Sequence, residues 1–189
     1  MSALALTDAP DFASPLEAWR AWRVVYRDGE YLLGSIVKPA LWPWGESLRA
    51  DCLHRRLPVP GRRGQRHAAP DSTCECGIYA AGLTQIGQYL GDLSAPFVKG
   101  MRPTVARVLG RVSLWGTVIE CERGYRASHA YPLEIFVPVD GQLGERHGWD
   151  ELAEGLAPYG VPLEPLAARC IDATTVLARR FPVARPTPG

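Results

Sequence analysis

The sequence predicts an α+β domain: a mostly antiparallel, bent sheet of about six short strands, two to four short helices on one side, and a long Arg/Pro/Gly-rich loop. Between Val108 and Glu122, apolar residues fall on alternate positions, as in a strand with one buried face. Asp28-Gly29 separates two runs rich in aromatic and β-branched residues, which is a strong hairpin signal. Residues 149–156 carry apolar side chains at helical spacing.

The length of 189 residues is sufficient for one domain with its own hydrophobic core. We assign this domain to residues 15–180, between a loose N-terminal leader at 1–14 and a frayed, Pro-rich tail at 181–189. The hydrophobic content of 47% and the charged content of 22% are those of an ordinary soluble globular protein.

The N-terminus has no basic segment before its short apolar run, and no apolar run is long enough to cross a bilayer. We therefore predict a cytoplasmic protein without a membrane partner. In that compartment, the five cysteines are expected to be reduced, metal-bound or buried rather than joined in disulfides.

The net charge of +1 gives no support for nucleic acid as a partner. Positive charge is nevertheless concentrated in the 55–70 loop, which contains five arginines and no acidic residue. Loops of this length inside a compact domain are uncommon and are either functional or disordered. We predict a protein or a small anionic ligand as the partner, and a solvated loop without a partner is the alternative.

The predicted elements of the first half of the chain are short. They are a helix start at 14–17, hairpin strands at 22–26 and 31–37, a helix at 48–52, a strand at 77–81 and a helix at 84–90. In the second half, residues 105–139 are expected to form a meander of three strands, the first two at 108–122 and 125–131. A helix at 149–156 that ends before Gly160 and a last helix at 171–180 follow.

Glycines are expected to shape the meander. Gly110 and Gly116 interrupt its first strand and indicate a bend, a bulge or a close backbone approach. The apolar side chains predicted to face the interior are Val108, Val112, Leu114 and Val118. In the last helix, the residues predicted to share a face are Ile171, Thr175 and Val176.

Cysteine and histidine residues flank the Arg-rich loop at both ends. The candidate metal ligands are Cys52, His54, His67, Cys74 and Cys76. Thiolates and imidazoles gathered at the ends of a long loop can form a tetrahedral zinc site, because the metal bonds offset the loop's ordering entropy. The C-x-C spacing is not a standard zinc motif, so small buried cysteines are the alternative. A nucleophilic thiol at Cys74 or Cys76 is a further alternative.

The 122–131 hairpin carries a second group of candidate binding residues, namely Arg123, Tyr125, Arg126, His129 and Tyr131. Arginine, histidine and tyrosine side chains together suit an anionic or planar ligand. The alternative is an ordinary cross-strand charge ladder, in which Glu120 and Glu122 lie opposite Arg126.

The segment GRVSLWGTVIECERGYRASHAYP, with CECGIYA upstream and YGVP downstream, resembles an uncharacterised family of soluble proteins from high-GC bacteria. This resemblance covers roughly residues 20–165 and implies a single domain but no activity. A weaker resemblance runs to the ADP-ribosyltransferase-like fold, through Arg23 in AWRVV, Tyr79 in GIYAA, and Glu120 or Glu134. It implies a small enzyme that uses NAD.

Three functional classes follow. The first is a non-enzymatic binding or regulatory module that acts through the 55–70 loop and the 122–131 hairpin. The second is a small ADP-ribosyltransferase-like enzyme with Arg23, Tyr79, Glu120 and Glu134 as its candidate catalytic residues. The third is a zinc-stabilised version of either.

Overall fold

The computed structural model describes residues 15–52, 67–91, 104–141, 143 and 147–182. These residues form seven strands, three α-helices and two short 3₁₀ helices. The strands are β1 (Leu16–Arg27), β2 (Glu30–Ser35), β3 (Leu48–Arg49), β4 (Ile78–Ala80), β5 (Ala106–Cys121), β6 (Gly124–Pro138) and β7 (Leu163–Leu166). The helices are α1 (Leu83–Ile86), η2 (Gly87–Tyr89), α2 (Trp149–Leu156), η3 (Ala157–Tyr159) and α3 (Ala173–Arg180).

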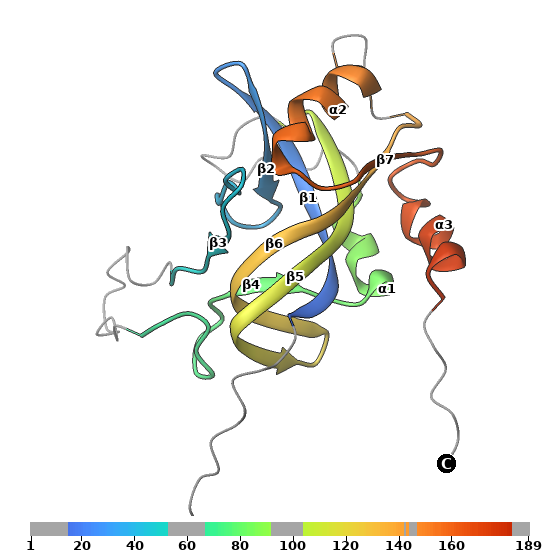
Figure 1. Ribbon diagram of the computed structural model, residues 1–189. Coiled ribbons are helices and arrows are strands. Elements are labelled where there is room, and N and C mark those ends of the chain that lie inside the picture. The colour runs from blue at the N-terminus through green and yellow to red at the C-terminus, as the bar shows by residue number, and fades with distance from the viewer. Residues whose placement is uncertain (1–14, 53–66, 92–103, 142, 144–146, 183–189) are drawn as a thin grey trace, which may run out of the picture.

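All seven strands belong to one sheet, whose main path runs β2-β1-β5-β6 in antiparallel pairs (Figure 1). The free edge of β6 is shared by three short strands: β4 and β3 pair antiparallel and β7 pairs parallel. The predicted α+β class and mostly antiparallel sheet are confirmed, with one parallel pair. The expectation of short strands is wrong for β1, β5 and β6, which have 12, 16 and 15 residues.

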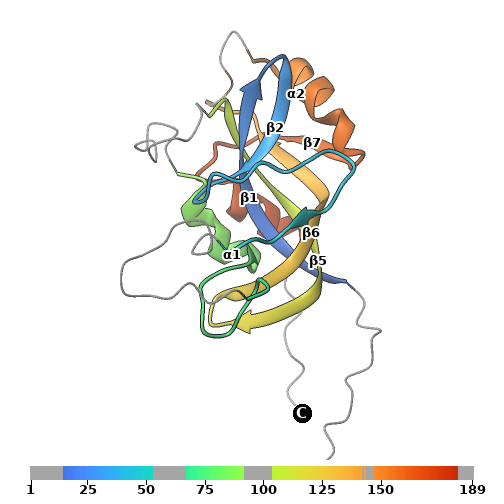
Figure 2. The ribbon, with the colours of Figure 1, turned by 90° about the vertical axis from the view of Figure 1, so that its left-hand side faces the viewer.

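The sheet is so strongly curved that the end of β4 meets β1. Ala81, the residue after β4, exchanges two backbone hydrogen bonds with Trp19 of β1, at 2.8 and 2.9 Å. Because β4 itself pairs with β6, this contact joins the two ends of the β1-β5-β6-β4 path (Figure 2). The concave side encloses the larger core, in which Trp22, Val108 and Ile135 are fully buried.

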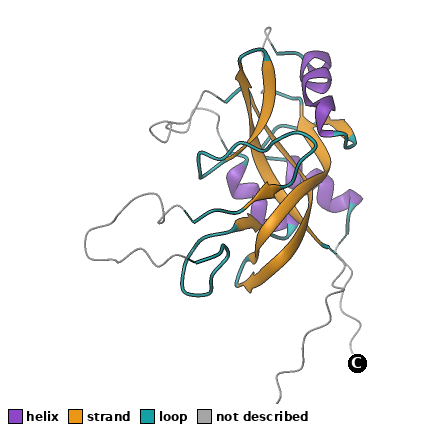
Figure 3. Ribbon diagram, turned by 60° about the vertical axis from the view of Figure 1, so that its left-hand side comes forward, coloured by secondary structure: helices purple, strands orange, loops and turns teal. Residues whose placement is uncertain are grey.

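Helices cover the sheet at two places rather than on one side as predicted. α1 and α3 contact each other (helices are purple in Figure 3), and they contribute Leu83 and Leu177 to a second core that also contains Phe136. α2 lies at another part of the sheet and contributes Leu152 and Leu156 to the larger core. A long, strongly curved sheet has both a concave and a convex face to cover, and each needs its own apolar partner.

Gly116 produces the sharpest irregularity in β5. Its φ of 74° is in the left-handed region, and a Cβ there would lie 2.2 Å from the Oγ of Ser128. The β5–β6 register shifts between Trp115 and Val118, as the predicted bulge requires. The shift also explains a wrong prediction: Val118 is 36% exposed, because the residues beyond the bulge no longer follow the alternation that buries Val112 and Leu114.

A tyrosine network fixes the C-terminal part of the chain to the sheet. The hydroxyl of Tyr159 accepts from the backbone N–H of Leu33 and donates to the carbonyl of Trp42, both at 2.8 Å. Tyr131 of β6 donates its hydroxyl proton to the carbonyl of Tyr159, also at 2.8 Å. Burial of the Tyr159 ring raises the pKa of its hydroxyl, so the hydroxyl stays neutral and can donate.

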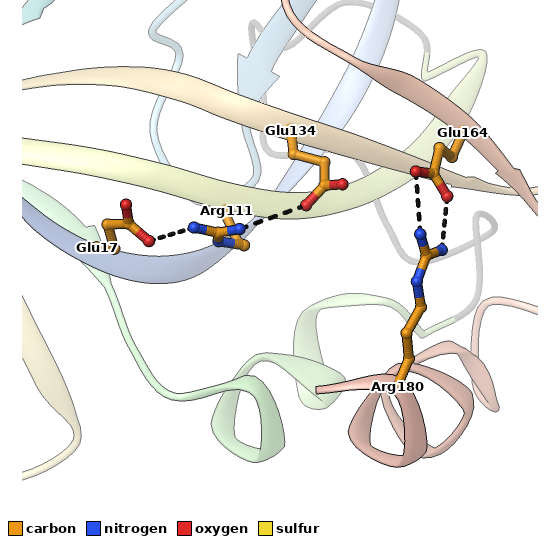
Figure 4. A network of polar contacts seen from close by, with 5 residues as sticks. All are labelled: Glu17, Arg111, Glu134, Glu164 and Arg180. Carbon is orange, nitrogen blue, oxygen red and sulfur yellow. Dashed lines mark hydrogen bonds and ion pairs between the residues drawn. The ribbon is translucent and has the colours of Figure 1, made fainter. Parts of the chain in front are cut away.

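Ion pairs on the convex face connect strands with the last helix (Figure 4). Arg111 of β5 contacts Glu17 of β1 and lies 3.8 Å from Glu134 of β6. Arg180 of α3 binds Glu164 of β7 through two N–O contacts of 2.5 and 3.1 Å. The hydrogen bonds from Arg180 lower the pKa of Glu164, so the carboxylate remains charged.

Several sequence predictions match the elements closely. The Asp28-Gly29 hairpin is confirmed, with φ values of 52° and 91° at its two turn residues. The helix predicted at 149–156 has those bounds, and Gly160 follows it in the left-handed conformation with a φ of 66°. The strand at 77–81 and the helix at 84–90 correspond to β4 and to α1 with η2.

Other predictions are wrong for reasons of tertiary pairing. Residues 14–17 were expected to begin a helix, but Leu16 begins β1, which pairs with β5. The helix expected at 48–52 is β3, because β6 offers a free edge there. The meander contains two long strands instead of three, since β6 continues unbroken from Gly124 to Pro138.

The last helix is confirmed but presents another face to the core. Ala173 and Leu177 are buried, whereas Ile171 is 61% and Val176 is 36% exposed. The leader at 1–14, most of the 55–70 loop and residues 183–189 of the tail lie outside the described residues.

The bulge at Gly116 yields a stability prediction. Gly116→Ala should lower the free energy of unfolding by more than about 1 kcal/mol, because a left-handed backbone costs an L-residue roughly 1–2 kcal/mol and the new methyl meets Ser128. Urea denaturation measures the change. Gly91→Ala is the matched control, since its Cβ would have no atom within 4 Å. Equal stability of the two variants would contradict the assigned bulge.

Candidate metal centre

The chain leaves and rejoins the sheet at neighbouring points. Ala50, which follows β3, donates its backbone N–H to the carbonyl of Ser128 at 2.7 Å. Ile78, the first residue of β4, pairs with Ala127. Because Ser128 and Ala127 are adjacent on β6, residues 51–77 form an excursion with both ends at one place on the sheet (Figure 1).

Four potential metal ligands gather at the neck of this excursion. Their ligand atoms all lie within 4.8 Å of one another, and they belong to Cys52, His67, Cys74 and Cys76. Cys52 and Cys76 are each only 3% exposed, while Cys74 and His67 are half-buried. The group could hold a metal ion, as the sequence predicted. His54, the fifth residue of that prediction, lies outside the described part of the chain.

Two contacts within the group are close to the ligand–ligand distances of a tetrahedral site. The Sγ atoms of Cys52 and Cys74 are 3.7 Å apart, and the Sγ of Cys76 lies 3.3 Å from Nε2 of His67. Two sulfurs bound tetrahedrally to zinc at about 2.3 Å are themselves about 3.8 Å apart. The sulfur pair therefore already has the spacing that a shared metal ion imposes.

Local turns shape the part of the excursion that carries Cys74 and Cys76. The side chain of Asp71 accepts hydrogen bonds from the backbone N–H and hydroxyl of Thr73, at 2.9 and 2.6 Å. Hydrogen bonds from Thr73 lower the pKa of Asp71 and keep it charged. Gly77 then turns the chain into β4 with a φ of 124°, where a Cβ would lie 3.1 Å from the Cβ of Arg126.

Arg126 of β6 holds this segment in place through hydrogen bonds to its backbone. Its Nη1 donates to the carbonyl oxygens of three residues of the turn, namely Asp71, Cys74 and Cys76. Its Nε donates to the Sγ of Cys121 at 3.2 Å, and that hydrogen bond raises the pKa of the guanidinium. The buried cation also places positive charge behind the thiols, which favours their thiolate forms when a metal binds.

Burial opposes ionisation of the thiols when no metal is bound. Burial, assisted by hydrogen bonding and repulsion from the neighbouring thiols, raises the pKa of Cys76 to about 11. Cys76 is therefore a protonated thiol near neutral pH and a poor nucleophile, because the thiolate is the reactive form. A metal ion would have to displace this proton in order to bind. The catalytic-thiol alternative therefore gains no support at Cys76.

The hairpin residues predicted to bind one ligand are divided among different surroundings. Arg123 is exposed and lines a cavity with Tyr125, whereas Arg126 is buried against the cysteine turn. His129 stacks on Trp115, with ring centroids 6.0 Å apart, and Tyr131 belongs to the tyrosine network. The alternative charge ladder does not have the expected register, because Ile119 rather than a glutamate pairs with Arg126.

The residues of the ADP-ribosyltransferase-like hypothesis do not share either of the two described cavities. Tyr79 lines the larger cavity and Glu120 the smaller one, while Arg23 and Glu134 line neither. Arg23 is buried and donates from Nε to the carbonyl of Ser35 at 3.0 Å. Glu134 lies beside Arg111 on the convex face.

Sequence reasoning missed two arginines that the fold makes important. The sequence predicts a ligand-binding role for Arg126 but not its hydrogen bonds to the backbone carbonyls of the cysteine turn. Arg20, which lines the larger cavity, carried no motif at all. Neither role leaves a local signal, because each depends on strands far apart in the sequence.

Comparisons with protein-family models, with curated proteins and with solved structures find no match for this chain. They give no support to either resemblance drawn from the sequence. Among the described residues, every helix is too short or too polar to cross a membrane.

Arg126 provides a test of the metal-binding geometry that leaves all four ligands in place. Arg126→Met should weaken the affinity for Zn²⁺ or Co²⁺ by about 10- to 100-fold, the usual effect of losing a group that orients the ligands. Competition with a chromogenic chelator measures the affinity. Arg123→Met, on the same hairpin but exposed, should leave it unchanged. Equal affinities of the two variants would show that Arg126 does not organise the site.

Proposed function

We propose that the protein is a non-enzymatic binding module whose fold is closed by one structural Zn²⁺. The ligands are Cys52, His67, Cys74 and Cys76. The single observation that supports this proposal is the convergence of three sulfur ligands and one imidazole at the neck of the 51–77 excursion.

The ligand set favours zinc over other common ions. Thiolates are soft ligands that select Zn²⁺, Cu⁺ or iron–sulfur clusters, and Mg²⁺ or Ca²⁺ prefer oxygen. Three cysteines and one histidine in a tetrahedral arrangement form a common structural zinc site. Four protein ligands leave no open position for water or substrate, whereas catalytic zinc sites keep one. The site therefore supports a structural role.

The position of the ligands indicates what the metal would do for the chain. Cys52 and His67 are the residues on either side of segment 53–66, so a shared ion would tie both ends of that segment together. Closing a loop by a metal removes conformational freedom that the chain would otherwise have to lose on folding or on binding. The segment contains the arginines at 55, 56, 62, 63 and 66.

This arrangement supports a role in binding an acidic protein or a small anionic ligand. The segment concentrates five positive charges in a chain with a net charge of only +1, and the exposed Arg123 of the 122–131 hairpin adds a further cation. Arginine clusters recognise carboxylate and phosphate groups through charge-assisted hydrogen bonds. The free thiols fit a reducing compartment, and a cytoplasmic location remains a prediction.

Metal analysis tests the zinc site directly. The purified protein should contain close to one zinc per chain, and Cys74→Ser should lose it. The variant should also unfold at a Tm lower by roughly 10 °C, because the lost binding energy of several kcal/mol stabilises only the folded state. Cys170→Ser is the control, since Cys170 lies outside the cluster.

The outcomes separate a metal site from a merely buried thiol group. Wild-type protein without metal, and unable to bind Co²⁺ with the absorption of thiolate ligands, would refute the proposal. A zinc content that survives in Cys74→Ser would show that the ligands are other residues.

The binding role is tested with a fluorescein-labelled peptide of ten glutamates. Arg62→Glu should weaken binding about tenfold more than Arg179→Glu, which changes the net charge equally on the exposed face of α3. Removing zinc with a chelator should also weaken binding, because the ends of segment 53–66 would be released. Fluorescence anisotropy measures both effects. Equal loss in the two variants would mean that only the overall charge matters.

A further inference from the structure

The larger of the two described cavities has a volume of about 650 Å³, and none of the four cysteine and histidine residues at the neck belongs to its lining, although their neighbours Asp51, Glu75 and Gly77 do. Its walls come from β1, the segment after β2, β4 and the α1 region. This volume is in the range of pockets that hold a small organic molecule. Neither the proposed zinc site nor segment 53–66 accounts for it.

Apolar side chains form much of the wall. Ile36 and Val37 line one side, and Ile78 and Ile86 line another, with the exposed ring of Tyr79 at the surface. Val37 and Tyr79 are 64% and 43% exposed, which is high for side chains of their size. These walls would be buried further by a ligand with an apolar body.

Arg20 is the polar group set into this apolar wall. Its Nη1 donates to the carbonyl of Tyr79, and its Nη2 donates to the Oγ of Ser35 at 3.1 Å. Its guanidinium also lies over the ring of Trp42, with 5.1 Å between Cζ and the ring centroid. A guanidinium carries five N–H groups, so these contacts leave donors for a further acceptor.

The charge of Arg20 has no counter-ion among the carboxylates of the described residues, since none lies within 4.0 Å of its nitrogens. Its Nε is buried without an acceptor in the same part of the chain. Burial lowers the pKa of Arg20 to about 10, so the group remains protonated near neutral pH but is destabilised by its surroundings.

The other ionisable groups of the cavity are distributed around it. The cations are Lys38, Arg49 and Arg123, and the carboxylates are Asp51 and Glu75. Lys38 donates to the backbone carbonyl of Glu75 and lies over the ring of Tyr79. With Arg20 included, the lining contains four cations and two carboxylates, so the cavity as a whole favours an anion.

We propose that this cavity binds a small organic carboxylate, with its carboxylate against the guanidinium of Arg20 and its apolar body along the isoleucine walls. The single charge of the Arg20 guanidinium, which lies among mostly apolar side chains, is balanced by a monoanion. An inorganic phosphate would leave the apolar walls uncovered, and a cation would meet the positive charge of Arg20. The site adjoins the proposed zinc site but uses none of its four ligands, and it requires no metal.

A matched pair of ligands tests the proposal by isothermal titration calorimetry. The probes are 2-naphthylacetate and 2-naphthylacetamide, which share an apolar body and differ in charge. Wild-type protein should bind the acid at least about tenfold more tightly, because hydrogen bonds to an ionised group are roughly twice as strong as neutral ones. In Arg20→Met, which keeps an apolar stem, this preference should disappear. Arg123→Met, at the rim, should retain most of it.

A second readout is taken on the wild-type protein itself. In a ¹H–¹⁵N spectrum of the wild type, the Arg20 Nε–Hε signal should shift on titration with the acid and stay unchanged with the amide. Arg20→Lys assigns this signal by its loss and should keep part of the preference for the acid.

Three outcomes would contradict carboxylate binding in this cavity. Equal affinity of the wild type for acid and amide, binding of neither, or an unchanged preference in Arg20→Met would overturn the proposal. The zinc content of each variant, measured in parallel, separates this result from the metal site: loss of acid binding with zinc retained concerns the cavity alone.

Discussion

The pairing along β6 is the constraint on which the rest of the structure depends. On one side β6 pairs with β5 over most of its length, which places the fully buried Val112 and Leu114 in the larger core. On the other side, its edge accepts β4, β3 and β7 in turn. The cysteines meet because β3 and β4 occupy neighbouring positions on this edge. The ligand group is therefore a consequence of strand order.

Arg126 connects this pairing with the chemistry at the neck. It faces the cysteine turn from near the beginning of β6, where it donates to three carbonyl oxygens and supplies a positive charge. A tetrahedral Zn²⁺ with three thiolates has a net charge of about −1, which a neighbouring guanidinium offsets. The same residue thus serves folding and ligand positioning, which explains why an arginine is buried in the sheet.

Much of the fold could be predicted from the sequence where local patterns decide the structure. The Asp28-Gly29 turn and the helix Trp149–Leu156 depend on neighbouring residues, and both were predicted correctly. Val118 was misplaced because one bulge reverses the side-chain alternation after Gly116. The candidate metal ligands could be predicted from residue type, but the cavity around Arg20 could not, because it is formed by segments that meet only in the folded chain.

The neighbouring partners of Ala50 and Ile78 on β6 have a further consequence. The number of residues between these two positions does not enter the register of the sheet, since β3 and β4 are each held by their own pairs. The pairing of β3 and β4 therefore does not depend on the number of residues that separate Cys52 from His67. A foreign peptide spliced between those two residues would leave the register of the sheet unchanged.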